Sequence, residues 1–286
     1  MMLSQKKRWS IVALAGLLVV ALGTVVWRTL REPEPVYLGK PVRVWLRLAV
    51  LRQDFQADAC LHEALRTADP VSKAQIEREL VRFVMKSLNT KDHPLWKPYN
   101  AVRTTLPRAI ATVMPTWQEP AVVRYHTTMW LYVQSFSSGA IPPSPSLFQR
   151  AMPVLCELAR SDPHKEIRHS ATLTLGGAGI FSPEASQILL RALNSTDTLE
   201  VLEAARWFAR NPVDPERVVP LLVKGFQDPD TRSDCATALR AYGPRAKFVV
   251  ERLVTLAKNN DRRVSSDATW VLEAIDPEAA KKARAK

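Results

Sequence analysis

Cysteine and histidine, the side chains that most often carry chemistry, are few in this sequence and widely spaced. The 286 residues include three cysteines and five histidines, and no CxxC or HExxH motif joins them. Cys60 and His62 are two residues apart, so on a helix they face different directions, which is poor geometry for a metal. His164 and His169 could meet around a turn, but no third ligand is near in sequence. We expect no metal site, and we expect solvated or capping roles for the histidines.

Motifs for catalysis and for phosphate binding are also missing from the sequence. The "GGAG" stretch at 176–179 follows a predicted helix and lacks the lysine of a phosphate-binding loop, so we interpret it as a flexible helix end. There is no GxSxG motif and no paired-acid motif. Cys156 and Cys235 fall inside predicted helices, where a free cysteine behaves as a small apolar residue. The sequence therefore predicts no catalytic residue and no cofactor, and the chain is not expected to be an enzyme.

Tryptophan is the residue that stands out, with eight copies. Two of them, Trp207 and Trp270, occupy equivalent positions in two similar helical segments. Each lies two residues after an alanine, and so on the opposite side of its helix from that alanine. An outward indole could anchor a partner, because aromatic residues dominate binding hot spots; the alternative is that each indole packs against a neighbouring segment. The same side carries acids and a single arginine, which suits a polypeptide better than a phosphate backbone. The predicted partner-binding strip consists of His169, Glu203, Trp207, Arg210, Asp234, Trp270 and Glu273.

A repeat in the C-terminal half positions this strip. Four similar segments align on one alanine each, at spacings of 34, 31 and 32 residues, and these are Ala171, Ala205, Ala236 and Ala268. Another apolar helical segment precedes each of them across a short polar turn. We call the first helix of each pair the A helix and the second the B helix. Antiparallel pairs with a period of thirty-odd residues are typical of a helical solenoid, in which each pair stacks on its neighbours to bury its apolar face.

The helical wheel of the B helices predicts which side faces the core. Positions four before and three and four after the alanine lie on its side of the helix. Apolar residues dominate there in three of the repeats, whereas Arg232 and Arg240 break the pattern in the third, and we expect only their stems to be buried. The alanines themselves are expected to lie buried between the A and B helices. Aspartates and Thr231 stand where an N-cap is needed.

A looser form of the repeat precedes these four pairs. It begins with a hairpin of two helices at 41–52 and 57–69, followed by a long helix at 71–88. An A helix at 104–114 and a B helix at 122–133 come next, and an insert at 137–146 separates them from the regular repeats. No sustained alternation of apolar and polar residues marks a sheet. We therefore predict an irregular region of HEAT-like helical repeats over 32–147 and four regular repeats over 148–286.

The N-terminal segment at 1–31 has the pattern of an exported or membrane-anchored protein. Three basic residues at 6–8 precede eighteen residues without a charge, 10–27, which is long enough to cross most of a bilayer as a helix. This bias favours a single-pass helix in the cytoplasmic membrane with the N-terminus inside and the bulk of the chain outside. Two alternatives are a cleaved signal peptide, with Ala21-Leu22-Gly23 as its cleavage site, and a buried soluble helix.

The net charge of +12 is not concentrated in the predicted repeats. Residues 1–31 hold five basic and no acidic residues, while 148–286 hold 21 basic against 18 acidic residues. A nucleic-acid-binding protein would gather its charge on one face of the folded part. Nucleic acid is therefore an unlikely partner, and we expect a protein partner.

The repeat resembles HEAT and HEAT-like repeat proteins. The likeness is carried by a polar residue shortly before a small one in the B helix, as in "IRHSA" and "VRYHT", after turns such as "SDP" and "QDPD". The segment "EPVYLGKPVRVWL" at 34–46 resembles the start of a group of bacterial exported HEAT-repeat proteins, and 93–115 resembles their central insert. The family implies a right-handed α-solenoid with B helices on its concave side. It also implies a scaffold, and it supplies no catalytic residue.

An all-α fold is therefore expected: one N-terminal transmembrane helix and a right-handed α-solenoid of antiparallel helix pairs. The expected function is that of a membrane-tethered scaffold for protein–protein interaction in the cell envelope. The alternative is a HEAT-like enzyme or nucleic-acid-binding protein that uses the concave face.

Overall fold

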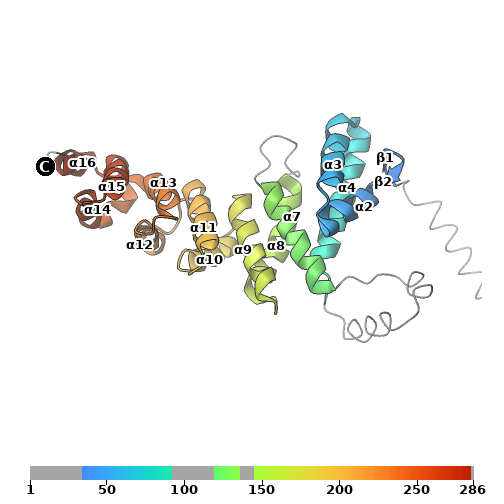
Figure 1. Cartoon of the computed structure of the whole chain (residues 1–286), viewed down its shortest axis with the longest axis horizontal. Helices are drawn as coiled ribbons and strands as arrows, with labels where there is room; N and C mark the ends of the chain where they lie inside the picture. Colours follow the sequence, from blue (N-terminus) through green and yellow to red (C-terminus); the bar gives the residue numbers. More distant parts are fainter. Residues whose placement is uncertain (1–33, 92–118, 136–144, 285–286) are drawn as a thin grey trace, which may run out of the picture. The chain divides into compact units, whose positions relative to one another are not determined.

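The computed structural model describes residues 34–91, 119–135 and 145–284, and these residues are predominantly helical (Figure 1). The predicted segments at 1–31 and 104–114, and most of the insert at 137–146, lie outside them. Among the described helices, none is both long and apolar enough to cross a bilayer. The chain divides into two compact units, 1–42 and 43–286. The prediction that the fold is built mainly of α-helices is confirmed.

The first unit contains a small hairpin that the sequence did not predict. Strands β1 (Val36–Tyr37) and β2 (Lys40–Pro41) pair antiparallel, with Val36 opposite Pro41 and Tyr37 opposite Lys40. The turn residues Leu38 and Gly39 both have positive φ, 48° and 73°, which matches the right-handed twist of a two-residue hairpin. Two residues per strand are too few to produce a readable alternation.

The second unit begins with four helical segments that follow the predicted ranges closely. They are α2 (Val42–Leu46), which runs into the π-helical turn η1 (Arg47–Leu51), then α3 (Phe55–Thr67), α4 (Pro70–Leu88) and α7 (Pro120–Ser135). Asp54 and Asp69 start α3 and α4, because each carboxylate accepts hydrogen bonds from two backbone N–H groups of the first turn. Pro70 fits the first turn of α4 because it has no N–H to leave unpaired.

Four antiparallel pairs of helices follow, as the repeat predicts. In chain order they are α8 (Pro145–Ser161) with α9 (Lys165–Ala178), α10 (Pro183–Ala192) with α11 (Thr198–Arg210), α12 (Pro215–Gly225) with α13 (Arg232–Tyr242), and α14 (Val250–Ala257) with α15 (Arg262–Ile275). A 3₁₀ segment η2 (Gly243–Val249) leads into α14, and a helix that was not predicted, α16 (Pro277–Arg284), packs on α15.

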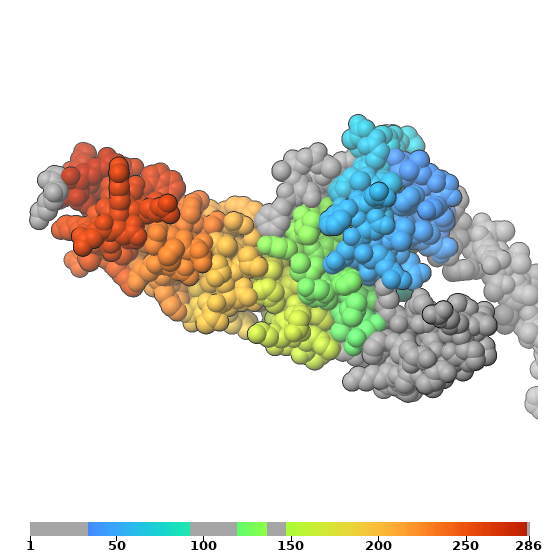
Figure 2. All heavy atoms as spheres, in the orientation of Figure 1, coloured from blue at the N-terminus to red at the C-terminus, as the bar shows by residue number. Residues whose placement is uncertain are grey.

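The B helices α7, α9, α11, α13 and α15 form a continuous series in which each contacts the next. In the space-filling view, the successive helix pairs from α9 to α15 lie in direct contact (Figure 2). All four central alanines are buried, so the predicted register is confirmed. Their small side chains allow the backbones of paired helices to approach closely.

Asp197, Asp261 and Thr231 all stand at N-cap positions, as predicted, but the Thr231 side chain makes no capping hydrogen bond. Asp197 and Asp261 accept hydrogen bonds from the first turns of α11 and α15. The Thr231 hydroxyl instead donates to the carbonyl of Gly225, at 2.7 Å. Arg232 is buried beside it and donates through Nε to the Phe226 carbonyl, at 3.2 Å. Both residues therefore hydrogen-bond to carbonyls at the end of α12, and the Gly225 carbonyl also accepts from the backbone N–H of Asp228 at 3.2 Å.

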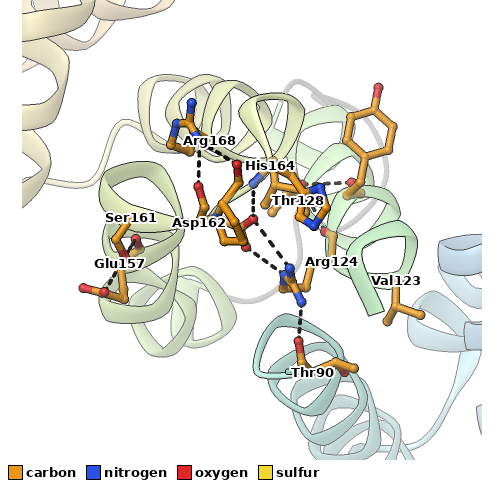
Figure 3. Close-up of polar contacts among 12 residues, drawn as sticks. Thr90, Val123, Arg124, Thr128, Glu157, Ser161, Asp162, His164 and Arg168 are labelled. Atoms are coloured by element: carbon orange, nitrogen blue, oxygen red, sulfur yellow. Dashed lines mark hydrogen bonds and ion pairs between the residues drawn. The ribbon is translucent and has the colours of Figure 1, made fainter. Parts of the chain in front are cut away.

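A buried ion pair joins the looser and the regular parts of the helical unit (Figure 3). Arg124 Nε on α7 donates to Asp162 Oδ2 at 2.8 Å, and Arg124 Nη1 donates to the Thr90 carbonyl at 2.6 Å. Asp162 also accepts from the backbone N–H of His164 at 2.9 Å. Both side chains of the pair are buried. The helices therefore pack continuously across the predicted division at 147/148, where only the regularity of the repeats changes.

Candidate functional site

The candidate functional site is a set of polar and aromatic side chains on the B helices, most of them opposite the central alanines, which we call the B face. Its members come from α7, α9, α11, α13 and α15 and include most of the strip predicted from sequence. We define the B face by Tyr132, His169, Arg206, Arg210, Asp234, Arg240, Trp270 and Glu273.

A central cluster on the B face connects three helices through Arg206 and Glu203. Arg206 on α11 donates through Nη1 to Glu203 Oε1 and through Nε to Asp234 Oδ1 of α13, both at 2.9 Å. The Tyr132 hydroxyl of α7 donates to Glu203 Oε1 at 3.2 Å. Two predicted residues, Glu203 and Asp234, are thus brought together by Arg206, which the sequence analysis did not single out.

Burial dominates the electrostatics of this central cluster. Glu203 is only 1% exposed, and this burial raises the pKa of its carboxyl group, against the opposing effect of Arg206. Burial and the nearby Glu203 together raise the pKa of Tyr132 to about 12, so the phenol stays protonated and donates. Oε2 of Glu203 is buried without a hydrogen-bond partner, which makes this a costly position for a carboxylate. Glu203 therefore lies beneath the surface, where a partner cannot contact it.

The "GGAG" stretch explains how α9 and α11 approach each other here. A Cβ atom at Gly176 would lie 2.6 Å from Cβ of Glu203, and one at Gly179 would lie 2.8 Å from Cζ of Arg210. Gly179 also has φ of +65° at the C-terminus of α9, a conformation that glycine adopts without strain. Arg210 Nη2 donates to the Gly176 carbonyl at 2.8 Å, and burial lowers the pKa of its guanidinium group. These glycines lie at the end of α9 and leave space for the side chains of α11.

Trp207 is fully buried, so of the two interpretations of this indole packing is correct, and its place in the predicted partner-binding strip is wrong. Its Nε1 donates to the Ile180 carbonyl at 3.0 Å. Its ring stacks on Phe181 at 6.0 Å between centroids and meets Phe208 edge-on at 5.1 Å. The indole therefore fills the gap between its own helix and the turn that ends the preceding pair.

Trp270 lies at the equivalent position of α15 and is 42% exposed. The guanidinium group of Arg240 on α13 covers its ring at 4.1 Å from the centroid and donates to the Trp270 carbonyl. Glu273, one turn further along α15, forms an ion pair with Arg284 of α16. We call Arg240, Trp270, Glu273 and Arg284 the terminal cluster. It presents an indole, two guanidinium groups and a carboxylate on the last two helices and on α13.

His169 belongs to a third, smaller group at the start of α9. Its Nδ1 lies 3.0 Å from Glu200 Oε1 and 3.8 Å from Asp197 Oδ2. It shares an open groove with Lys165, Arg168 and Arg191, among other residues. The structure does not connect His169 to the central or terminal cluster, so the predicted strip divides into separate groups.

Sequence reasoning missed Tyr132, Arg206 and Arg240 as members of these clusters. Arg206 directly follows a central alanine. Arg240 lies four residues after another central alanine, at a position that the helical wheel assigns to the core side. Only the packing between repeats reveals their partners.

The described residues contain no group of three or more histidine, cysteine, aspartate or glutamate side chains placed to hold a metal. Cys156 and Cys235 are buried and unpaired, and Cys60 is partly exposed and also unpaired. Burial raises the pKa of Cys235 to about 12, so its thiol is unreactive at neutral pH. The expected burial of the two helix cysteines is confirmed.

No family model matches this chain, and no curated protein matches it. Among solved structures, the chain is similar to two engineered proteins of the Northeast Structural Genomics Consortium. The first is 20% identical with a TM-score of 0.41, over 78% of this chain and 96% of that one. The second is 17% identical with a TM-score of 0.38, over 85% of this chain and 76% of that one. The class that the structure itself defines is an all-α protein built of stacked helix pairs.

Proposed function

We propose that this chain is a right-handed α-solenoid of HEAT-like repeats that acts as a non-enzymatic scaffold and binds a protein partner on its B face. The terminal cluster is the main contact. The observation that carries the proposal is the exposed Trp270 ring held under Arg240. Tryptophan and arginine are the residue types most enriched at the energetic centres of protein interfaces.

Three features of the B face support a polypeptide partner. The indole is held by a neighbouring helix, so little side-chain entropy is lost when a partner covers it. Arg240 and Glu273 offer charges of both signs beside it, as the rim of an interface does. In the central cluster, Arg206 and Asp234 remain partly exposed while paired with each other, which adds a second polar contact on α11 and α13.

We propose further that residues 1–31 tether the scaffold to the cytoplasmic membrane, with the repeats outside the cytoplasm and in the periplasm where the cell has two membranes. The support is the basic start followed by eighteen uncharged residues. A reporter that is active only after export, fused after Lys286, tests this topology. Activity of the reporter is expected, and a signal confined to a cytoplasmic reporter would contradict it. A mature chain that begins at Thr24 would identify a cleaved signal instead.

The partner surface is tested by site-specific photocrosslinking in intact cells. Benzoylphenylalanine placed at Trp270 is expected to give a discrete crosslinked product, identified by mass spectrometry. The matched control is the same residue at Phe55, an exposed aromatic at the start of α3, away from the terminal cluster. Binding of the identified partner should then weaken by at least about 2 kcal/mol in Trp270→Ala, with the fold retained. Equal crosslinking at both positions, or unchanged binding by the variant, would refute the proposed surface.

A further inference from the structure

A groove between α9 and α11, which we call the first basic groove, is lined by more basic than acidic side chains. It measures about 320 Å³, which lies within the range of sites that hold ligands. Lys165 and Arg168 come from α9 and Arg191 comes from the last turn of α10, whereas Glu200 of α11 is the acidic residue of the lining. Glu200 lies 3.0 Å from Nδ1 of His169, so the groove retains an excess of positive charge.

A similar groove lies two repeats further along the chain, between α13 and α15, and we call it the second basic groove. It measures about 570 Å³ and is lined by Arg232 of α13 and by Arg262 and Arg263 of α15, with Asp267 as its acidic residue. Most residues that line the two grooves stand at the starts of B helices or at the ends of A helices. Both grooves therefore lie along the edge of the stacked pairs where the B helices begin.

One arginine in each groove is held in place by the turn that precedes its helix. Arg168 Nη1 donates to the Asp162 carbonyl at 2.7 Å (Figure 3). Arg232 Nε donates to the Phe226 carbonyl at 3.2 Å. A carbonyl group has no net charge, so it orients a guanidinium group without neutralising it. Both arginines therefore add fixed positive charge to the wall of their groove.

The other basic side chains of the two grooves are exposed: Lys165 and Arg191 in the first, Arg262 and Arg263 in the second. None of the four forms an ion pair with another residue in the described part of the chain. An arginine can bind a carboxylate through two parallel hydrogen bonds, and a lysine adds a point charge beside it. Each groove therefore offers a contact for one or two carboxylate groups.

Acidic residues interrupt this edge and decide which kind of anion fits it. Glu200 and Asp267 lie in the grooves themselves, and Asp228 and Asp230 are exposed on the α12–α13 turn, which borders the second groove through Pro229. A nucleic acid carries a charge at every phosphate and would meet these carboxylates. A polypeptide can place acidic residues opposite the grooves and neutral residues between them. The charge pattern therefore favours a polypeptide.

The stacking of the B helices sets the distance between the two grooves. Packed helices lie about 8–10 Å apart, and α9, α11, α13 and α15 contact one another in series. The first groove lies between α9 and α11 and the second between α13 and α15, so two such steps, about 16–20 Å, separate them. An extended peptide advances about 3.3 Å per residue. It would therefore reach from one groove to the other in about five or six residues.

We propose that the two basic grooves together bind one extended acidic segment of a polypeptide. The segment places carboxylates in each groove, with about five or six residues from the first acidic site to the second. This inference rests on the proposed scaffold function, because it supplies a further contact for a protein partner, on residues other than those of the terminal cluster.

The test uses synthetic peptides and the full chain in a non-ionic detergent, with binding measured by fluorescence anisotropy. The spanning peptide holds two glutamate pairs in a glycine–serine chain, with the second pair about five or six residues after the first. One comparison peptide has the pairs about two residues apart, and another has a single pair. The spanning peptide should bind at least about tenfold more tightly than either, because its second contact forms within the complex.

One variant in each groove tests whether both grooves take part. Arg191→Gln and Arg263→Gln each remove an exposed cation and should each weaken binding of the spanning peptide about threefold to fivefold. The control is Arg252→Gln, which removes the same charge from the first turn of α14, away from both grooves, and should weaken binding less than about twofold. Equal affinity for the three peptides, or equal losses in all three variants, would indicate diffuse attraction to a basic surface and would overturn the proposal.

Competition with inorganic tripolyphosphate tests the nature of the occupant. If it displaces the labelled peptide at a lower concentration than the unlabelled spanning peptide does, a polypeptide is the wrong occupant and the proposal fails. The photocrosslinking at Trp270 separates this inference from the proposed function. A discrete crosslink there without binding of the spanning peptide would overturn the grooves and leave the scaffold intact. Binding that depends on both grooves, without a crosslink at Trp270, would support the grooves and remove the terminal cluster as the main contact.

Discussion

Trp207 and Trp270 occupy the same position in two repeats, and yet one is fully buried and the other is 42% exposed. Both indoles face the preceding repeat. In the first case that repeat ends in Ile180 and Phe181, which supply a carbonyl acceptor and an aromatic ring. In the second case it supplies Arg240, which covers only one face of the ring.

The difference shows that a repeat position fixes the direction of a side chain but not its environment. The residues that the preceding repeat supplies decide whether an indole is packed or displayed: a turn residue, Phe181, stacks on Trp207, whereas a residue inside α13, Arg240, covers Trp270. A binding surface can therefore arise in one repeat through the side chains that its neighbour supplies, here Arg240 against Trp270 and Phe181 against Trp207.

The largest effect is expected where the two repeats are alike, at the central alanines. Ala205 and Ala268 are both fully buried. Replacing either with arginine overpacks the core and buries an unpaired charge, so each variant should lose at least about 4 kcal/mol of unfolding free energy in urea titrations. Thr237→Arg, at an exposed position of α13, is the control and should change stability by no more than about 0.5 kcal/mol. Similar melting of Ala205→Arg and the unmodified protein would mean that the register is wrong.

The next largest effect should separate the two tryptophans. Trp207→Ala removes a buried indole with its hydrogen bond and two aromatic contacts, and should cost about 3–5 kcal/mol. Trp270→Ala removes a half-exposed ring and should cost about 1 kcal/mol or less. Urea denaturation of both variants measures the contrast. Equal losses would show that the exposed indole is as important for packing as the buried one, and would weaken the proposed partner surface.

The features that the sequence predicted are those that depend on neighbours along the chain. The helix ranges, the buried alanines and the caps at Asp197 and Asp261 follow from periodicity and from local backbone chemistry. The β-hairpin was too short for its pattern to be read, and α16 has too few apolar residues to show a stripe.

The members of the site were harder to predict because their contacts cross repeats. Tyr132 is 71 residues from Glu203, and they meet because Gly176 lets α11 lie close to α9. Trp130 is 72 residues from Asp58. The helical wheel gives an angle around one helix axis, so it could not reveal that Trp207 is covered by the turn of the preceding repeat.

A third indole, Trp130, extends the comparison to pH. It donates to Asp58, which also accepts from Gln134 and lies beside His62, whose pKa is raised. A raised folded-state pKa contributes stability that is present below the unfolded value of 6.5 and is lost as pH rises through the folded value. The unfolding free energy should therefore fall slightly as the pH rises from 6.5 through the folded-state pKa of His62. His62→Gln should abolish this pH dependence. The matched control is His164→Gln, at the N-terminus of α9, which should keep it. An unchanged slope in His62→Gln would exclude His62 as its source.

The smallest effect concerns the pair that displays Trp270. Because the indole remains exposed to water, its contact with the Arg240 guanidinium should contribute only about 0.5–1 kcal/mol. A double-mutant cycle of Arg240→Ala and Trp270→Ala, measured by urea denaturation, isolates this coupling from the other contacts of each residue. The same cycle for Arg240→Ala and Trp207→Ala should give no coupling, because Trp207 packs against Phe181 and Phe208. A coupling of zero for the first pair would mean that the ring is not held in place. Trp270 would then have to be ordered by the partner, and the binding energy attributed to a preformed indole would be lost.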